Sequence, residues 1–268
     1  MSKNKKISSY RDFSAMNEDD QFAYVESFKT LRTNLMFGLA QREDKRILLT
    51  SSLPSEGKTI TAFSLSIALA QTGVRVLIVD ADMRSPKIHR YIRQKNDIGL
   101  SAVLSGTCEI NSAVVPTEYE NLWVMKAGQL PPNPAELLEG RYAEKMFLEL
   151  QEKFDYVIYD TPPVNLVSDA LSIAKKSTAI LFVVREGSST HEELKKSLRA
   201  IEQANLDLIG IVLNDSKIEK SSKYYKRKYG YGYGYGYGTR PRKEQNDEDD
   251  DDTISKNASG SLKNGKAK

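Results

Sequence analysis

Uninterrupted apolar runs constrain the fold of this 268-residue chain more than any other feature. Val76–Val79 and Ile180–Val184 contain no polar residue, whereas a strand with one face in water alternates apolar and polar residues. Such runs are typical of a parallel sheet covered by helices on both faces. Segments of helical periodicity lie between them, so we expect one doubly wound α/β domain. The predicted strands are Arg46–Ser52, Arg75–Asp80, Leu122–Lys126, Tyr156–Asp160, Ala179–Val184 and Ile209–Asn214, and the predicted helices are Phe22–Leu39, Lys58–Gln71, Leu100–Leu104, Pro134–Lys153 and His191–Ala204.

Composition divides the chain into three parts. After residue 216 a basic stretch leads into alternating tyrosine and glycine (Tyr229–Gly238) and an acidic run (Asp247–Asp252), with few aliphatic residues. Such a segment buries too little apolar surface to offset the entropy lost on ordering. We therefore expect a flexible N-terminus (1–20), a folded domain (21–216) and a disordered tail (217–268). The tail holds 13 basic and 8 acidic residues against 26 and 28 in the rest, so the basic excess does not indicate nucleic-acid binding by the folded domain.

Residue counts exclude several classes of protein. The single cysteine, Cys108, rules out a disulfide framework and cysteine-based metal clusters, and His89 and His191 alone offer little for a histidine metal site or a Ser-His-Asp triad. No apolar run approaches the ~18–20 residues that cross a bilayer, and the first residues are polar, unlike a signal peptide. We expect a soluble cytoplasmic protein.

The first predicted strand leads into a phosphate-binding loop. The segment Ser52–Thr59 matches G-x-x-x-x-G-K-[ST] except that serine takes the first position. Backbone amides of such a loop cradle phosphates, the lysine reaches the β- and γ-phosphates and the hydroxyl binds Mg²⁺. A chance Gly-Lys-Thr at a helix start is the alternative, but the flanking strand and helix favour the loop. The residues expected to bind ATP are Ser52, Pro54, Ser55, Glu56, Gly57, Lys58 and Thr59.

Carboxylates follow two other predicted strands. Asp80 and Asp82 end the second strand and Asp160 ends the fourth, as in a Walker B strand. Ligands of open α/β sheets bind outside the carboxyl ends of the strands, so these groups can converge with the loop on one Mg²⁺–phosphate site. Any one of them alone fits a turn residue equally well. Asn214 ends the last strand, where its amide could bind a purine edge or simply form a turn.

With these residues in place, the chain resembles the bacterial tyrosine kinases of capsule and exopolysaccharide operons, of the cytoplasmic type encoded apart from a membrane-anchored activator. The matching features are Ser52–Thr59 (Walker A), Asp80–Asp82 (the second, A-prime motif), Asp160 (Walker B), Ala127–Leu138 and the tyrosine-rich tail. The resemblance implies a P-loop NTPase-like fold with ATP and Mg²⁺ as cofactors. It implies that Lys58 binds ATP, that Asp80 is the base toward a tyrosine hydroxyl, and that Thr59, Asp82 and Asp160 hold the metal.

The resemblance also implies partners. Glu26, Lys29 and Arg32 are similar to the family's E-x-x-R-x-x-R oligomerisation motif and share one helix face, so a ring of copies is expected, although such a run also fits a solvated surface. A membrane activator would recruit the protein to the inner face of the membrane, where protein tyrosines are its substrates. A neighbouring copy would phosphorylate the tail, unless that segment only self-associates. The tail tyrosines are Tyr224, Tyr225, Tyr229, Tyr231, Tyr233, Tyr235 and Tyr237.

Three other functions compete with a tyrosine kinase. A ParA/MinD-like positioning ATPase carries a signature lysine early in its loop, where this chain has Leu53. A polypeptide-binding regulator would have a degenerate nucleotide site, but the expected loop and acidic residues are all present. The basic, aromatic tail could bind nucleic acid, which the Asp247–Asp252 run opposes. We therefore predict an ATP- and Mg²⁺-dependent protein-tyrosine kinase that regulates capsule and exopolysaccharide synthesis and has no nucleic-acid partner.

Overall fold

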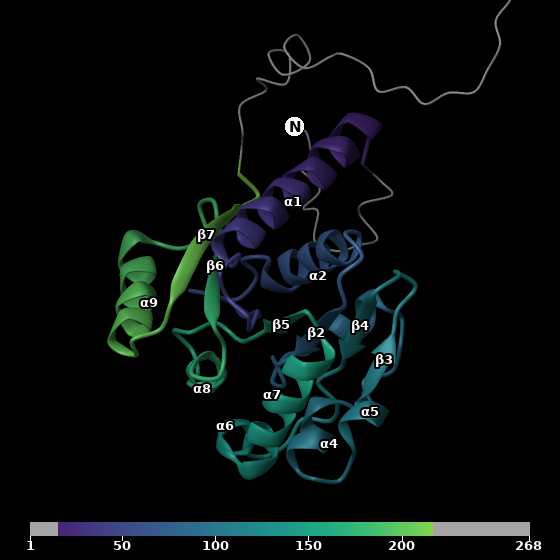
Figure 1. The fold of residues 1–268 in the computed structure, drawn as a ribbon. Coiled ribbons are helices and arrows are strands. Elements are labelled where there is room, and N and C mark those ends of the chain that lie inside the picture. Colours follow the sequence, from purple (N-terminus) through teal and green to yellow (C-terminus); the bar gives the residue numbers. More distant parts are fainter. Residues whose placement is uncertain (1–15, 217–268) are drawn as a thin grey trace, which may run out of the picture. The chain divides into compact units, whose positions relative to one another are not determined.

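The computed structural model describes residues 16–216, drawn as coloured ribbon in Figure 1. The chain divides into two compact units, Met1–Ile218 and Glu219–Lys268, and every described residue belongs to the first. The predicted tail and its seven tyrosines lie outside the described residues. No helix within 16–216 is long and apolar enough to span a membrane.

The described residues form a seven-stranded sheet in the order β3-β4-β2-β5-β1-β6-β7. Every neighbouring pair is parallel except β3 and β4, which confirms the predicted mainly parallel sheet. The strands are β1 (Arg46–Ser51), β2 (Val76–Asp80), β3 (Val114–Pro116), β4 (Leu122–Met125), β5 (Tyr156–Asp160), β6 (Ala179–Arg185) and β7 (Leu208–Asn214).

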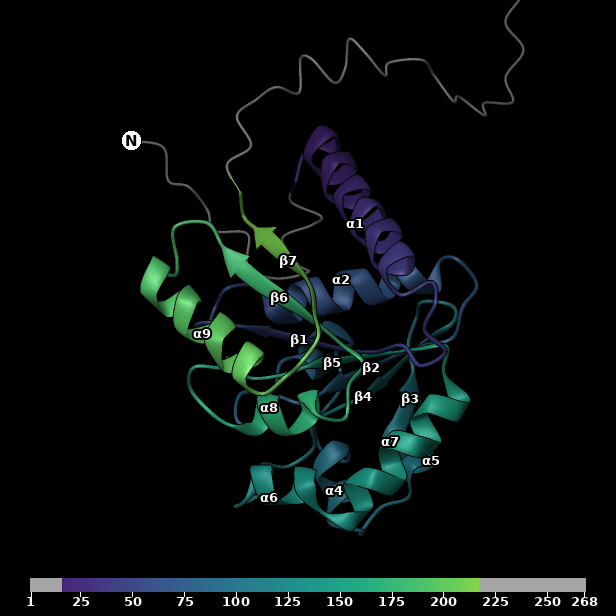
Figure 2. The same ribbon diagram turned by 60° about the vertical axis from the view of Figure 1, so that its left-hand side comes forward.

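Helices cover both faces of this sheet (Figure 2). On one face α1 and α2 bury Ile47 and Leu49 of β1, and on the other α4 to α9 cover the intervening Leu48. Because both faces are buried, successive strand positions are all apolar, which accounts for the uninterrupted runs. The helices are α1 (Glu18–Gly38), α2 (Lys58–Ala70), α3 (Ile88–Tyr91), α4 (Leu100–Leu104), α5 (Ile110–Ala113), α6 (Pro134–Glu139), α7 (Arg141–Lys153), α8 (Asp169–Ala174) and α9 (His191–Gln203).

Helix α1 begins earlier than predicted. The Asn17 side chain accepts a hydrogen bond from the Asp20 backbone amide and caps the helix, and the acidic residues Glu18 to Asp20 suit the positive end of its dipole. The helix therefore starts before Phe22, where the sequence predicted its first residue, and the domain boundary at residue 21 stays a prediction.

The predicted helix Pro134–Lys153 is two helices, α6 and α7. Gly140 lies between them with extended backbone angles (φ −75°, ψ 165°), so it ends one helix and caps the next. Strand β3 and the short helices α3, α5 and α8 are absent from the sequence prediction. Each is at most six residues long, too short for a periodic pattern to indicate it.

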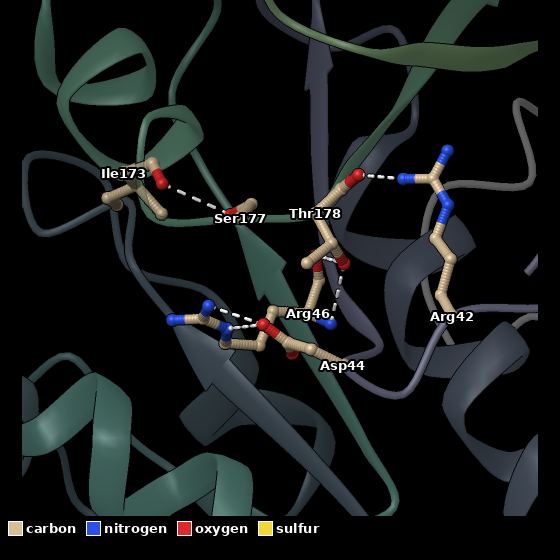
Figure 3. A network of polar contacts seen from close by, with 6 residues as sticks. All are labelled: Arg42, Asp44, Arg46, Ile173, Ser177 and Thr178. Carbon is tan, nitrogen blue, oxygen red and sulfur yellow. Dashed lines mark hydrogen bonds and ion pairs between the residues drawn. The ribbon is translucent and has the colours of Figure 1, made fainter.

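The amino ends of β1 and β6 are joined by paired polar groups (Figure 3). The Arg46 amide donates to the Thr178 hydroxyl (3.1 Å), and the Arg46 guanidinium binds Asp44. Arg42 reaches the Thr178 carbonyl and also pairs with Asp207. The groups expected to bind ligand lie at the opposite, carboxyl edge of the sheet.

Candidate active site

The phosphate-binding loop connects β1 to α2, as the sequence predicted. Lys58 and Thr59 form the first turn of α2 and are both buried. The loop bends through left-handed backbone angles at Ser55 (φ 66°) and Gly57 (φ 92°). A Cβ atom on Gly57 would lie 1.9 Å from the Asn214 side-chain nitrogen, so any other residue would combine an unfavourable left-handed φ with displacement of that amide. Backbone amides at the start of a 13-residue helix suit an anionic phosphate group.

Loop residues divide into two sets by exposure. Pro54 and Ser55 are exposed, whereas Ser52 and Glu56 are fully buried. The Glu56 side chain turns inward, and one of its oxygens accepts a hydrogen bond from the Leu53 amide (2.9 Å). The buried side chains of Ser52 and Glu56 shape the loop from inside, and the contacts expected between nucleotide and Ser52, Pro54, Ser55 and Glu56 stay predictions.

Asn214 lies beside the loop at the end of β7. Its side-chain nitrogen donates to the Glu56 carbonyl at 2.9 Å, a contact that the sequence did not indicate. The same amide retains its oxygen for a purine edge, and that base contact stays a prediction.

Three carboxylates converge at the ends of β2 and β5. Asp80 and Asp160 are register partners on these adjacent strands, and both are almost fully buried. One oxygen of Asp80 accepts the backbone amides of Lys87 and Ile88, each at 2.9 Å. The other Asp80 oxygen and both oxygens of Asp160 have no hydrogen-bond partner among residues 16–216. Asp82 is also buried and accepts the Ser85 amide at 3.0 Å.

Burial and mutual repulsion perturb these groups. Burial raises the pKa of Asp160 to about 6, opposed by the Lys58 ammonium and the Thr59 hydroxyl nearby. Burial, reinforced by the Asp160 charge, raises the pKa of Asp80 well above its ordinary value. Burial also raises the pKa of Asp82, where Lys58 again acts in the opposite direction. Burial thus makes the ionised form of each of these three carboxylates costly.

A divalent cation would fit this cluster. The unpartnered carboxylate oxygens of Asp160 are hard ligands, the type that Mg²⁺ takes. Within residues 16–216 no group of three or more histidine, cysteine, aspartate or glutamate side chains is placed to hold a metal ion by itself. Magnesium is usually held by one or two carboxylates together with phosphate and water, so the present residues match its needs in a nucleotide complex.

Arg84 and Asp169 form an ion pair at the same edge of the sheet, which the sequence did not indicate. The Arg84 guanidinium donates to both oxygens of the fully buried Asp169 at 2.8 and 3.2 Å. This ion pair joins the segment after β2 to α8, and the Arg84 charge neutralises the Asp169 carboxylate, whose own charge raises the pKa of Asp82.

The three residues of the expected oligomerisation motif are not brought together. Lys29 pairs with Glu26 at 2.7 Å, but Arg32 donates to the Ala68 carbonyl near the end of α2 (3.0 Å). Arg32 therefore helps fix α1 on α2, and a role of this motif between copies stays a prediction.

Comparison with known proteins identifies close relatives. A family model described as an AAA domain matches residues 54–211. The tyrosine-protein kinase YwqD of Bacillus subtilis is 34% identical over 222 residues, 83% of this chain and 93% of that protein. The solved kinase domain of the Escherichia coli tyrosine kinase ETK is 33% identical, with a TM-score of 0.71 over 80% of both chains. The crystal structure of the chimerical protein CapA2B2 is 37% identical, with a TM-score of 0.68 over 70% of this chain and 83% of that one.

The positioning ATPases share the fold at lower similarity. The septum site-determining protein MinD of Pyrococcus horikoshii, solved with Mg-ADP, is 22% identical with a TM-score of 0.56, over 68% of this chain and 76% of that one. That likeness confirms the P-loop NTPase-like fold but says nothing of a shared activity. The chain belongs to the bacterial tyrosine-protein kinases of capsule and exopolysaccharide synthesis.

Proposed function

We propose that this kinase transfers the γ-phosphoryl group of ATP, bound with Mg²⁺, to tyrosines in the tail of another copy. The observation that carries the proposal is the set of buried, unpartnered carboxylate oxygens of Asp80 and Asp160 beside the phosphate loop. Unpaired buried charge is costly, and a bound cation and nucleotide would compensate it.

Each site residue has a distinct part in this proposal. Lys58 and the loop amides bind and orient the triphosphate, and Thr59, Asp82 and Asp160 would hold Mg²⁺, which neutralises charge on the phosphates. The free oxygen of Asp80 accepts the proton of the attacking tyrosine hydroxyl, while the other oxygen stays fixed by the amides of Lys87 and Ile88. Transfer of this kind depends on positioning and charge neutralisation more than on covalent help.

Partners complete the proposed function. The seven tail tyrosines alternate largely with glycine, which allows each phenol to enter an active site in extended form. A ring of copies would present each tail to a neighbour. Similarity to the chimerical protein CapA2B2 supports a second polypeptide as activator, which we place in the membrane so that it recruits the kinase to the inner face.

Phosphotyrosine mapping tests the site. The purified chain is incubated with Mg-ATP, with and without an activator fragment, and its phosphotyrosines are located by mass spectrometry. Lys58→Met should abolish tail phosphotyrosine while the circular dichroism spectrum stays that of the wild type, because the fold does not need the phosphate contact. Undiminished tail labelling in Lys58→Met would refute the assigned site.

A second measurement tests the acceptor. Changing all seven tail tyrosines to phenylalanine should preserve ATP binding and remove most self-labelling. Labelling that persists at Tyr24 or another tyrosine of the folded domain would refute the tail as main acceptor, and ATP hydrolysis with an unmodified wild-type tail would instead favour a positioning ATPase.

A further inference from the structure

We propose that Ser189 and Ser197, outside every motif considered above, are positioning residues that hold the phosphate loop in its nucleotide-binding shape. They act through the buried loop side chains of Glu56 and Ser52. The inference rests on the proposed nucleotide site, and it identifies contacts that influence the affinity of that site for nucleotide.

Three hydrogen bonds hold Glu56 in place. One carboxylate oxygen accepts the Leu53 amide (2.9 Å) within the loop, and the other accepts the Ser189 hydroxyl (2.6 Å) from the turn between β6 and α9. Its carbonyl accepts the Asn214 side chain from β7 (2.9 Å). Because the Glu56 carboxylate is fully buried, loss of a donor would leave buried charge unsatisfied and favour a loop shape that returns it to water.

Ser52 forms a second contact, between the loop and α9. Its hydroxyl lies 2.9 Å from that of Ser197 on α9, and both side chains are fully buried. Ser197 also bonds the Glu193 carbonyl one turn earlier in the same helix. The serine that replaces the first glycine of the loop motif therefore connects the end of β1 to α9.

The loop needs such support because its shape is locally unfavourable. Ser55 has a positive φ of 66°, a region that residues other than glycine rarely adopt. Nucleotide binds only the properly shaped loop, so its apparent affinity falls in proportion to the population of that shape. Loss of one of these hydrogen bonds should raise KM for ATP and Kd for ADP by the same factor. The kcat should change little, because transfer proceeds only from the assembled loop.

Nucleotide affinity of the full-length chain tests the inference. Kd for Mg-ADP is measured with fluorescent methylanthraniloyl-ADP, and KM and kcat are measured for tyrosine phosphorylation. Ser189→Ala removes a hydrogen bond to a charged group and should raise Kd and KM about tenfold. Ser197→Ala removes a neutral one and should raise them about threefold. Both should leave kcat within about twofold of the wild type.

Two serines serve as matched controls. Ser188 is the exposed neighbour of Ser189, and Ser66 is a buried serine of α2 whose hydroxyl donates to the Ala62 carbonyl one turn earlier. Ser188→Ala and Ser66→Ala should leave nucleotide affinity unchanged. Glu56→Gln can still accept from Leu53 and donate to Ser189, so it should lose far less affinity than Glu56→Ala.

The outcomes separate this inference from the function on which it rests. Wild-type protein that binds no Mg-ADP would refute both. Tight wild-type binding with Ser189→Ala and Ser197→Ala equal to their controls would refute the positioning role alone, as would Glu56→Gln as weak as Glu56→Ala. If Ser197→Ala does not fold, Ser189→Ala in the turn still decides.

Discussion

Replacement of Asp160 by asparagine should stabilise the nucleotide-free protein. The substitution keeps the side-chain size and removes one of three buried charges at the ends of β2 and β5. A rise in pKa from 3.8 to about 6 on folding means that ionised Asp160 costs about 3 kcal/mol at neutral pH. For a domain of this size, Asp160→Asn should raise Tm by about 6–12 °C.

The pH dependence follows from the direction of that shift. Because the folded state holds the Asp160 proton more tightly than the unfolded state, wild-type stability falls as pH rises from about 4 to about 6. Below that window both states are protonated and the penalty vanishes, whereas above it the full penalty applies. The gain from Asp160→Asn should be largest at pH 8 and about half as large at pH 5.

Thermal and urea unfolding of the full chain, without Mg²⁺ or nucleotide, measure this gain. Asp169→Asn is the matched control, because it removes a buried carboxylate that has Arg84 as partner and should destabilise the protein instead. Mg-ADP should raise the wild-type Tm much more than that of Asp160→Asn. A variant no more stable than wild type at pH 8 would refute the cost assigned to burying the ionised Asp160 carboxylate.

Three further changes test contacts at the carboxyl edge of the sheet and between α1 and α2. Gly57→Ala should weaken nucleotide binding, measured by calorimetry, because its Cβ would displace the Asn214 amide from the Glu56 carbonyl; Gly73→Ala has a similar positive φ with nothing within 4 Å and should retain binding. Arg84→Ala leaves Asp169 buried without its partner and should lower the free energy of unfolding, measured in urea, by about 2 kcal/mol. The cost is below that of a fully buried pair because water screens the half-exposed guanidinium. Arg32→Ala removes the hydrogen bond to the α2 carbonyl and should cost about 1 kcal/mol; an unchanged urea midpoint would refute the role of Arg32 in holding α1 on α2.

The sequence was informative wherever the cause of structure is local. The apolar runs predicted the buried strands, and Asp80, Asp82 and Asp160 follow strand ends, which topology alone brings to one edge. The phosphate loop could be predicted because its glycine, lysine and threonine have fixed spacing. The prediction of a single helix over Pro134–Lys153 was wrong at Gly140. The helical periodicity extends across both halves, and one residue alone interrupts the helix.

Contacts between distant segments could not be predicted. Ser189 and Ser197 lie more than 130 residues beyond the loop side chains that they bind, and both residue types are common at helix starts and in turns. The inward turn of Glu56 has no signal of its own, since an acidic residue in a loop normally faces water. Arg84 and Asp169 are likewise paired by the fold, which places the segment after β2 against α8.

The carboxylates at the two ends of the sheet differ in their partners, and this difference supports a functional role for the acidic cluster. At the amino edge Asp44 pairs with Arg46 and Asp155 with Arg75, so each carboxylate has its cation within the protein (Figure 3 shows the former pair). At the carboxyl edge Asp160 is more deeply buried yet has no hydrogen-bond partner among residues 16–216. One oxygen of Asp44 is also buried without a hydrogen-bond partner among residues 16–216, but its other oxygen binds Arg46, whereas neither oxygen of Asp160 has a partner. Such an unpartnered carboxylate beside the phosphate loop is what a site that receives its cation from solution together with a nucleotide would require.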